Sequence, residues 1–256
     1  MDWVRRRAGS LLGVGLVGGL VWTTVVTLSM PNWYDPGEDC ARKVGAVDAV
    51  PRTSWFPPSA SCVSGDEVRQ YMSTTRSVVL SVVGVLLLVL IATGLILTVR
   101  RLGGDPGPTR TGGDDDLKRR RRSHLVFGAL DMAVAFAFVT FLNAAAIVFG
   151  SLPGAVLFLV AALVGLSAFG AVLDRHMGPL PSTALDSRRR GTVAGLTAFG
   201  VVFAATAVTG QLPFFRFWAF PLGAIAYAVI VALQWSRVRG RGEPAGPAEE
   251  ARPGRH

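Results

Sequence analysis

The sequence is poor in the residue types from which most catalytic and metal sites are built. It has three histidines, two cysteines and 17% charged residues, whereas an average soluble domain has about 25% charged residues. It contains no nucleophile elbow, zinc-protease motif, phosphate-binding loop or paired metal-ligand spacing. A hydrolase or a metalloenzyme therefore has no support, and the sequence predicts a protein that is not an enzyme and that holds no metal ion or cofactor.

What the sequence has instead is six apolar stretches, each close to the ~20 residues that a helix needs to cross ~30 Å of hydrocarbon. They predict an all-α membrane protein with six transmembrane helices, whose main partner is the lipid bilayer. A cleaved signal peptide is the alternative for the first stretch, but that stretch is too long and no A-x-A-like site follows it. The expected helices cover about residues 11–30, 78–99, 125–149, 152–173, 192–212 and 214–235.

Positively charged residues fall in every second gap between these stretches, and short basic loops prefer the cytoplasm. Both termini are therefore predicted to be cytoplasmic, in a multi-pass protein of the plasma membrane. An even number of spans, such as six, agrees with that arrangement. The formal net charge of +9 would suggest a nucleic-acid partner if it formed one patch. Because the basic residues are spread over separate segments, we expect no nucleic acid.

The gaps divide the chain into domains. Residues 1–99 are expected to form a transmembrane hairpin with an extracytoplasmic loop at 31–76, and residues 124–236 a four-helix transmembrane bundle. Between them, residues 100–123 combine Gly, Pro and runs of like charge, which cannot bury enough surface to fold. This cytoplasmic linker is expected to be disordered, as is the cytoplasmic tail at 237–256.

Both cysteines, Cys40 and Cys62, lie in the predicted extracytoplasmic loop, on the side where thiols are oxidised. We expect a disulfide between them, which would brace a loop too short to build a substantial core, by about 3 kcal/mol in the chain-entropy model. A redox-active pair is the alternative, but the sequence lacks a C-x-x-C motif. The expected core of the loop is a small aromatic cluster of Trp33, Tyr34, Trp55 and Phe56.

The segment Ser54-Trp55-Phe56-Pro57-Pro58, followed by Cys62, adds a resemblance. Together with Cys40, it resembles the ectodomain of small uncharacterised actinobacterial multi-pass membrane proteins, which carry an aromatic-Phe-Pro-Pro segment ahead of a cysteine between two helices. The resemblance covers only the first hairpin, and it implies no activity, cofactor or site residue.

Asp131 is the one clearly intramembrane acid, and a charge there is costly enough to need a partner, protonation or a function. His124 lies seven residues earlier on nearly the same helical face, so a proton could pass toward Asp131 from the cytoplasmic surface. Both are candidate intramembrane functional residues. The structural alternative is that Asp131, near a helix start, pairs with Arg175 or with a hydroxyl of a neighbouring helix.

Two classes of function remain for such a chain. The favoured one is an accessory or interaction component of the cell envelope, whose outer loop contacts another envelope or membrane protein; a homo-oligomer is compatible with it. The alternative is a small transporter or channel subunit that uses Asp131 for proton or ion coupling. A membrane-embedded lipid enzyme would need polar groups that converge at one interface. The sequence names no substrate.

Overall fold

The computed structural model describes residues 8–31, 35–45, 49–104, 109–110, 117–179 and 182–239. Most of the predicted disordered linker and tail, together with Trp33 and Tyr34, lies outside these residues. The contacts divide the chain into two units, each built from several segments. The first unit consists of Met1–Gly104, Phe138–Gly165 and Thr206–Phe217, and the second of Asp105–Ala137, Leu166–Ala205 and Trp218–His256.

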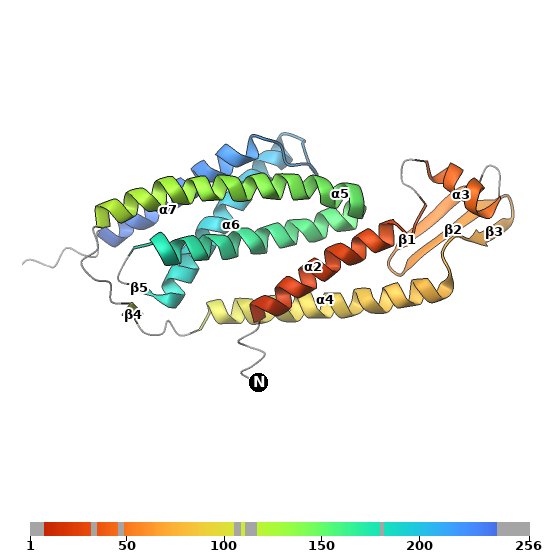
Figure 1. The fold of residues 1–256 in the computed structure, drawn as a ribbon, viewed down its shortest axis with the longest axis horizontal. Coiled ribbons are helices and arrows are strands. Elements are labelled where there is room, and N and C mark those ends of the chain that lie inside the picture. Colours follow the sequence, from red (N-terminus) through yellow and green to blue (C-terminus); the bar gives the residue numbers. More distant parts are fainter. Residues whose placement is uncertain are drawn as a thin grey trace, which may run out of the picture. The chain divides into compact units, whose positions relative to one another are not determined.

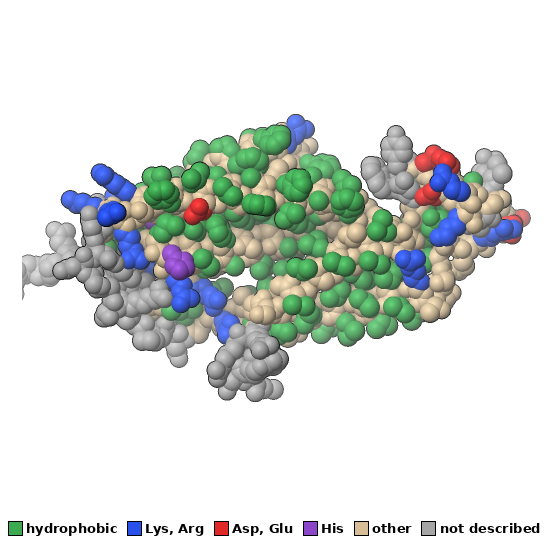
Figure 2. Space-filling model, in the orientation of Figure 1, with side chains coloured by type: hydrophobic (Ala, Val, Ile, Leu, Met, Phe, Trp, Pro, Cys, Tyr) green, Lys and Arg blue, Asp and Glu red, His purple; other side chains and the backbone are tan. Residues whose placement is uncertain are grey.

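The described chain is mostly helical, and five of its helices are long and apolar enough to cross a membrane (Figure 1). This confirms the predicted apolar helices of membrane-spanning length. On the helices in Figure 2 the visible side chains are mainly hydrophobic. The five helices are α2 (Ala8–Thr27), α4 (Thr74–Leu102), α5 (Leu117–Met177), α6 (Ala184–Val208) and α7 (Ala219–Arg239).

Helix α5 contains two of the predicted spans within its 61 residues. Its helical geometry breaks at Ser151, whose backbone has φ 50° and ψ −151°. Its two ends belong to the second unit and its middle to the first, so the chain doubles back at this break. Gly154 makes the turn possible, because a Cβ there would lie 2.7 Å from the carbonyl oxygen of Ala146.

Several helix ends differ from the predicted bounds. Helix α5 already begins at Leu117, inside the predicted linker, because its basic run consists of good helix formers. Helix α6 begins at Ala184, where the Thr183 hydroxyl accepts a hydrogen bond from the backbone N–H of Asp186, at 3.0 Å. Helix α7 begins only at Ala219, later than predicted. This start places Pro221 in the first turn of the helix, where a proline is tolerated.

In the first unit, the predicted loop folds into a small domain, which we call the loop domain. It contains helix α3 (Pro36–Val44) and the antiparallel strands β1 (Val50–Trp55), β2 (Pro58–Ser64) and β3 (Glu67–Gln70), in the order β1-β2-β3. The all-α prediction is wrong here. Strands β2 and β3 join through a two-residue turn that begins at Gly65, whose φ of 58° suits a tight hairpin.

A disulfide joins helix α3 to strand β2, as predicted, between Cys40 and Cys62. Both cysteines are buried, and Tyr71 packs against them. The expected aromatic cluster is only partly present among the described residues. Trp55 packs against a core that includes Met30 and Met72, whereas Phe56 is exposed.

Helices α2 and α4 run side by side in the first unit (Figure 1). Small residues allow this close approach, since a Cβ at Gly94 would lie 2.8 Å from the backbone nitrogen of Leu12. The indole of Trp22 lies against Gly84 and donates a hydrogen bond to the carbonyl oxygen of Leu80, at 2.8 Å. The loop between α6 and α7 is held in the same unit by a hydrogen bond.

That bond runs from the Phe215 N–H to the buried Asn143 side chain, at 3.1 Å.

In the second unit, the last part of α5 and helix α6 touch at the level of their backbones. A Cβ at Gly195 would lie 2.8 Å from the carbonyl carbon of Leu166 and 3.0 Å from the Cα of Ser167. Strands β4 (Thr109–Arg110) and β5 (Ser182–Thr183) form a two-stranded antiparallel sheet.

The change Gly195→Ala is expected to destabilise the protein by about 1–3 kcal/mol, because the added methyl group would overlap backbone atoms that cannot move aside. Gly200 in the same helix has no neighbouring atom within 4 Å of its Cβ position, so Gly200→Ala is the matched control and should leave stability unchanged or slightly raised. Thermal unfolding of the purified protein, followed by circular dichroism, measures both. Equal midpoints for the two variants would contradict this close packing.

Replacing both Cys40 and Cys62 with alanine is expected to lower the stability of the loop domain by about 3 kcal/mol. The loss comes from the freedom that the unfolded segment gains without the cross-link. Limited trypsin digestion of the purified protein, which can cleave at the exposed Arg69, should then cut the loop domain faster than in the parent protein. An unchanged cleavage rate would show that the sheet and helix α3 hold the domain without the disulfide.

Candidate functional site

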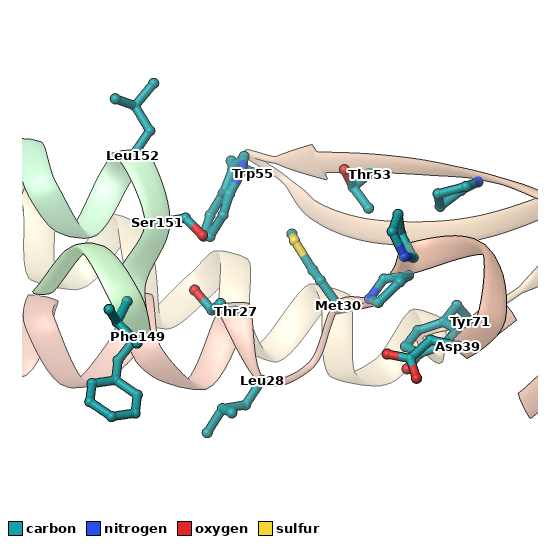
Figure 3. A pocket seen from close by; sticks show the side chains of 14 residues that line it. Thr27, Leu28, Met30, Asp39, Thr53, Trp55, Tyr71, Phe149, Ser151 and Leu152 are labelled. Atoms are coloured by element: carbon teal, nitrogen blue, oxygen red, sulfur yellow. The ribbon is translucent and has the colours of Figure 1, made fainter. Parts of the chain in front are cut away.

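A pocket of about 570 Å³ lies in the first unit, between the loop domain and the turn of helix α5 (Figure 3). Its size falls within the ~300–1,000 Å³ of typical small-molecule sites. Five parts of the chain contribute to its wall, namely the end of α2, helix α3, strand β1, the segment between β3 and α4, and the turn of α5. The lining residues are Thr27, Leu28, Met30, Pro31, Pro36, Asp39, Pro51, Thr53, Trp55, Tyr71, Val148, Phe149, Ser151 and Leu152.

One end of the pocket carries a carboxylate beside a phenol. Asp39 stands in the first turn of α3, which Asp35 caps by accepting a hydrogen bond from the backbone N–H of Glu38. Burial raises the pKa of the Tyr71 phenol, the Asp39 carboxylate raises it further, and Arg42 lowers it. Tyr71 is therefore neutral at pH 7 and able to donate a hydrogen bond. Among the described residues that line the pocket, Asp39 is the one acidic side chain.

The other end of the pocket offers hydrogen-bond donors. Trp55 and Ser151 line it, and Figure 3 shows the Ser151 hydroxyl pointing toward the Trp55 ring. Within the described part of the chain, neither the Trp55 indole N–H nor the Ser151 hydroxyl has a hydrogen-bond partner. Thr27, by contrast, donates to the carbonyl oxygen of Thr23 at 2.8 Å. The indole N–H and the hydroxyl are thus the hydrogen-bond donors that Trp55 and Ser151 contribute to this end of the pocket.

The rim of the pocket is apolar. The side chains of Leu28, Phe149 and Leu152 are 75%, 56% and 72% exposed, and in Figure 3 they point away from the cavity. They belong to the ends of segments that are long and apolar enough to cross a membrane. The pocket therefore has polar groups inside and hydrophobic side chains around its edge.

A second group of polar side chains is buried in the second unit, around His124. The indole N–H of Trp235 donates to His124 Nδ1 at 3.1 Å, and His124 Nε2 lies 3.1 Å from the Tyr227 hydroxyl. An indole N–H can only donate, so Nδ1 must be the unprotonated nitrogen. The proton of the neutral imidazole is then on Nε2, which donates to Tyr227. Trp235 thus selects one tautomer of His124.

The same unit contains a buried ion pair between Asp174 and Arg190. Arg190 donates to both carboxylate oxygens of Asp174, at 3.0 and 3.3 Å, and the Asp174 side chain is 1% exposed. Gln234 of helix α7 donates to the backbone carbonyl of Arg190 at 3.0 Å. These bonds connect helices α5, α6 and α7. Arg120 also donates to the carbonyl oxygen of His176, at 2.9 Å.

The two predicted intramembrane residues are not brought together. His124 is fully engaged by Trp235 and Tyr227, whereas Asp131 forms no ion pair or hydrogen bond with another residue in the described segments. The expected pair with Arg175 is not present either. In the described part of the second unit, the acid that pairs with an arginine is Asp174, which the sequence places at a helix end.

Sequence reasoning missed both the Asp174–Arg190 pair and the pocket. An acid at the end of one predicted helix, facing three arginines across a short loop, was a signal for the pair. The pocket had no such signal, because its wall comes from five separate segments between residues 27 and 152. As for metals, no group of three His, Cys, Asp or Glu residues within the described ranges is arranged to hold an ion.

The chain matches no protein-family model, and comparisons with curated proteins and with solved structures also find no match.

The buried pair predicts a contrast between two aspartates. Asp174→Asn is expected to destabilise the protein by about 3 kcal/mol, because it leaves the Arg190 guanidinium without its anionic partner. Asp131→Asn removes a carboxylate that has no such partner and should change stability by less than ~1 kcal/mol. Thermal unfolding of both purified variants measures the difference. A larger loss for Asp131→Asn would mean that its charge has a structural partner after all.

Proposed function

We propose that this chain is a non-enzymatic component of the cell envelope that spans the plasma membrane six times, with both termini in the cytoplasm. In this arrangement the loop domain is extracytoplasmic and binds an envelope component through its pocket. The doubling back of α5 at Ser151 supports the count of six, because it divides 61 residues into two legs. The basic residues around α5, α6 and the tail support the orientation.

The observation that carries the binding role is the pocket, which is lined by both polar and apolar side chains. The Cys40–Cys62 disulfide and strands β1 to β3 hold its wall in place without a ligand. A preformed cavity of this size with a few polar groups inside is typical of binding sites. In the described part of the chain, the titratable residues that line the pocket are Asp39 and Tyr71, and these two do not form the pair of nucleophile and base that covalent catalysis needs.

The alternative role as a proton-coupled transporter has less support. It would need Asp131 to face a cavity or a chain of hydrogen-bonding groups. Asp131 does not line the pocket described above, and His124 already uses both of its ring nitrogens.

The proposed topology predicts opposite labelling of two engineered cysteines. In the described chain both native cysteines are in the disulfide and none is free, so the parent protein is the unlabelled control. In intact cells stripped of their wall, a membrane-impermeant maleimide should label Asp66→Cys in the β2–β3 turn. Ser236→Cys, exposed near the end of α7, should react only after the membrane is permeabilised. Labelling of both positions from outside would overturn the topology.

The binding role predicts a pocket-specific adduct in intact membranes. A photoreactive amino acid in place of Thr53, which is exposed and lines the pocket, should form a defined covalent adduct with an envelope component on irradiation. The same amino acid in place of Asp66, outside the pocket, is the control and should not form it. Mass spectrometry of the cross-linked protein identifies the adduct. The absence of any adduct specific to position 53 would overturn the binding role.

A further inference from the structure

We propose that the second unit binds the phosphate group of an anionic phospholipid at the end where α5 and α6 begin and α7 ends, which we call the inner end. Arg121 and Ser187 supply hydrogen-bond donors to the phosphate, and Arg122, Arg188 and Arg237 supply positive charge around it. The inference goes beyond the proposed function, which concerns the loop domain, and it does not depend on the pocket.

Hydrogen bonds join four helix ends at the inner end. They connect the start of α5 to the end of α7, the end of α7 to the start of α6, the start of α6 to the end of α5, and the end of α5 back to its start. The bonds are Trp235 to His124, Gln234 to the Arg190 carbonyl, Arg190 to Asp174, and Arg120 to the His176 carbonyl. Because these bonds form a closed ring, side chains on the four ends surround one region.

The inner end carries positive charge that the described chain does not balance. Arg122, Arg188 and Arg237 are exposed, and none of them has an ion pair or hydrogen bond within the described residues. The acids Asp174 and Asp186 are already engaged, the first by an arginine and the second by a threonine hydroxyl. Figure 2 shows Lys and Arg side chains gathered at this end of the second unit. Such a cluster attracts an anion.

Two buried hydrogen-bond donors at the inner end have no acceptor in the part of the chain that the structure describes. They are Nε of Arg121, at the start of α5, and the hydroxyl of Ser187, at the start of α6, which is 3% exposed. Burying an unpaired donor costs free energy, so such a group calls for an acceptor. A phosphate group provides several acceptor oxygens, and its negative charge suits a guanidinium.

Exposed apolar side chains beside the arginines favour a lipid over free phosphate. On α5, Val126 and Leu130 follow Arg122 at steps of four residues and are 63% and 59% exposed. On α7, Leu233 precedes Arg237 by four residues and is 51% exposed. Residues four apart lie on the same face of a helix, so acyl chains attached to a phosphate at the arginines would lie along these side chains. A lipid of net negative charge also leaves no ammonium group to oppose the arginines.

The test measures thermal unfolding of the full-length protein in mild detergent, with and without an added lipid. A ligand that binds only the folded state raises the unfolding midpoint. Phosphatidylglycerol should raise it, and phosphatidylcholine, whose headgroup has no net charge, should raise it less. Inorganic phosphate at the same concentration should leave it unchanged. Native mass spectrometry of the same samples gives the Kd of phosphatidylglycerol.

Variants locate the site. Arg121→Gln should raise this Kd about tenfold, because a charge-assisted hydrogen bond is lost, and Arg121→Lys, which keeps the charge, should recover part of the loss. Ser187→Ala should raise the Kd several-fold without lowering the midpoint of the lipid-free protein, since it removes a buried hydroxyl that lacks a partner there. Arg216→Gln, the same change at an exposed arginine in the loop between α6 and α7, is the control and should leave the Kd unchanged.

Each variant must first show the parent midpoint without lipid. If Arg121→Gln does not, the double change Arg122→Gln and Arg188→Gln replaces it, because both side chains are exposed and changes at such positions rarely alter stability. The same rise in Kd is expected for this double variant.

Four results would overturn the inference. Phosphatidylcholine as effective as phosphatidylglycerol would remove the role of charge, and an unchanged Kd in the variants at positions 121 and 187 would remove the assigned donors. An equal rise of the Kd in Arg216→Gln would show attraction to positive charge in general. Inorganic phosphate as effective as phosphatidylglycerol would assign the site to a soluble phosphate. None of these results bears on the pocket, so the proposed function is tested separately.

Discussion

Hydrocarbon supplies no hydrogen-bond partners, so a chain that enters it must pair its backbone and polar side chains internally. Several polar side chains of the second unit follow that constraint, whereas Asp131 and the buried Ser187 hydroxyl have no hydrogen-bond partner in the described part of the chain. Both carboxylate oxygens of Asp174 accept hydrogen bonds from Arg190, and the ring of His124 is hydrogen-bonded to Trp235 and Tyr227. In the first unit the Trp22 indole donates a hydrogen bond to the carbonyl oxygen of Leu80. These bonds also connect neighbouring helices. The same hydrogen bonds therefore pair the polar groups and fix how the helices pack.

A second consequence of the same constraint is the use of small residues at contacts. Lipid tails are as apolar as leucine, so helices gain from van der Waals contact and not from expelling water. Backbone-level contact at Gly94 in the first unit and at Gly195 in the second provides it. The loop domain depends on other physics, since its strands pair by backbone hydrogen bonds and its disulfide limits the unfolded state.

The helices and the disulfide were predictable because each depends on local or elementary information. An apolar run of sufficient length predicts a helix wherever it occurs, and two cysteines without competitors predict their own pairing. The sheet was not predictable, because strands β1 and β3 have no buried residue and only β2 alternates, with Pro58, Ala60 and Cys62 buried. Asp131 was a sound candidate by the cost of an intramembrane charge, but the pairing of Asp174 depends on which helices become neighbours.

The sequence by itself determined that the chain has apolar helices of membrane-spanning length, where these helices approximately lie, and that Cys40 bridges to Cys62. These features could be predicted because they depend on hydrophobicity, on the length of the apolar runs and on the number of cysteines. They do not depend on which segments become neighbours. Only the tertiary structure decided that α5 reverses at Ser151, that Arg190 pairs with Asp174, and that Asp39, Trp55 and Ser151 line one pocket. The reason is physical: these features arise between segments that are distant in the chain, and they depend on packing that no single segment encodes.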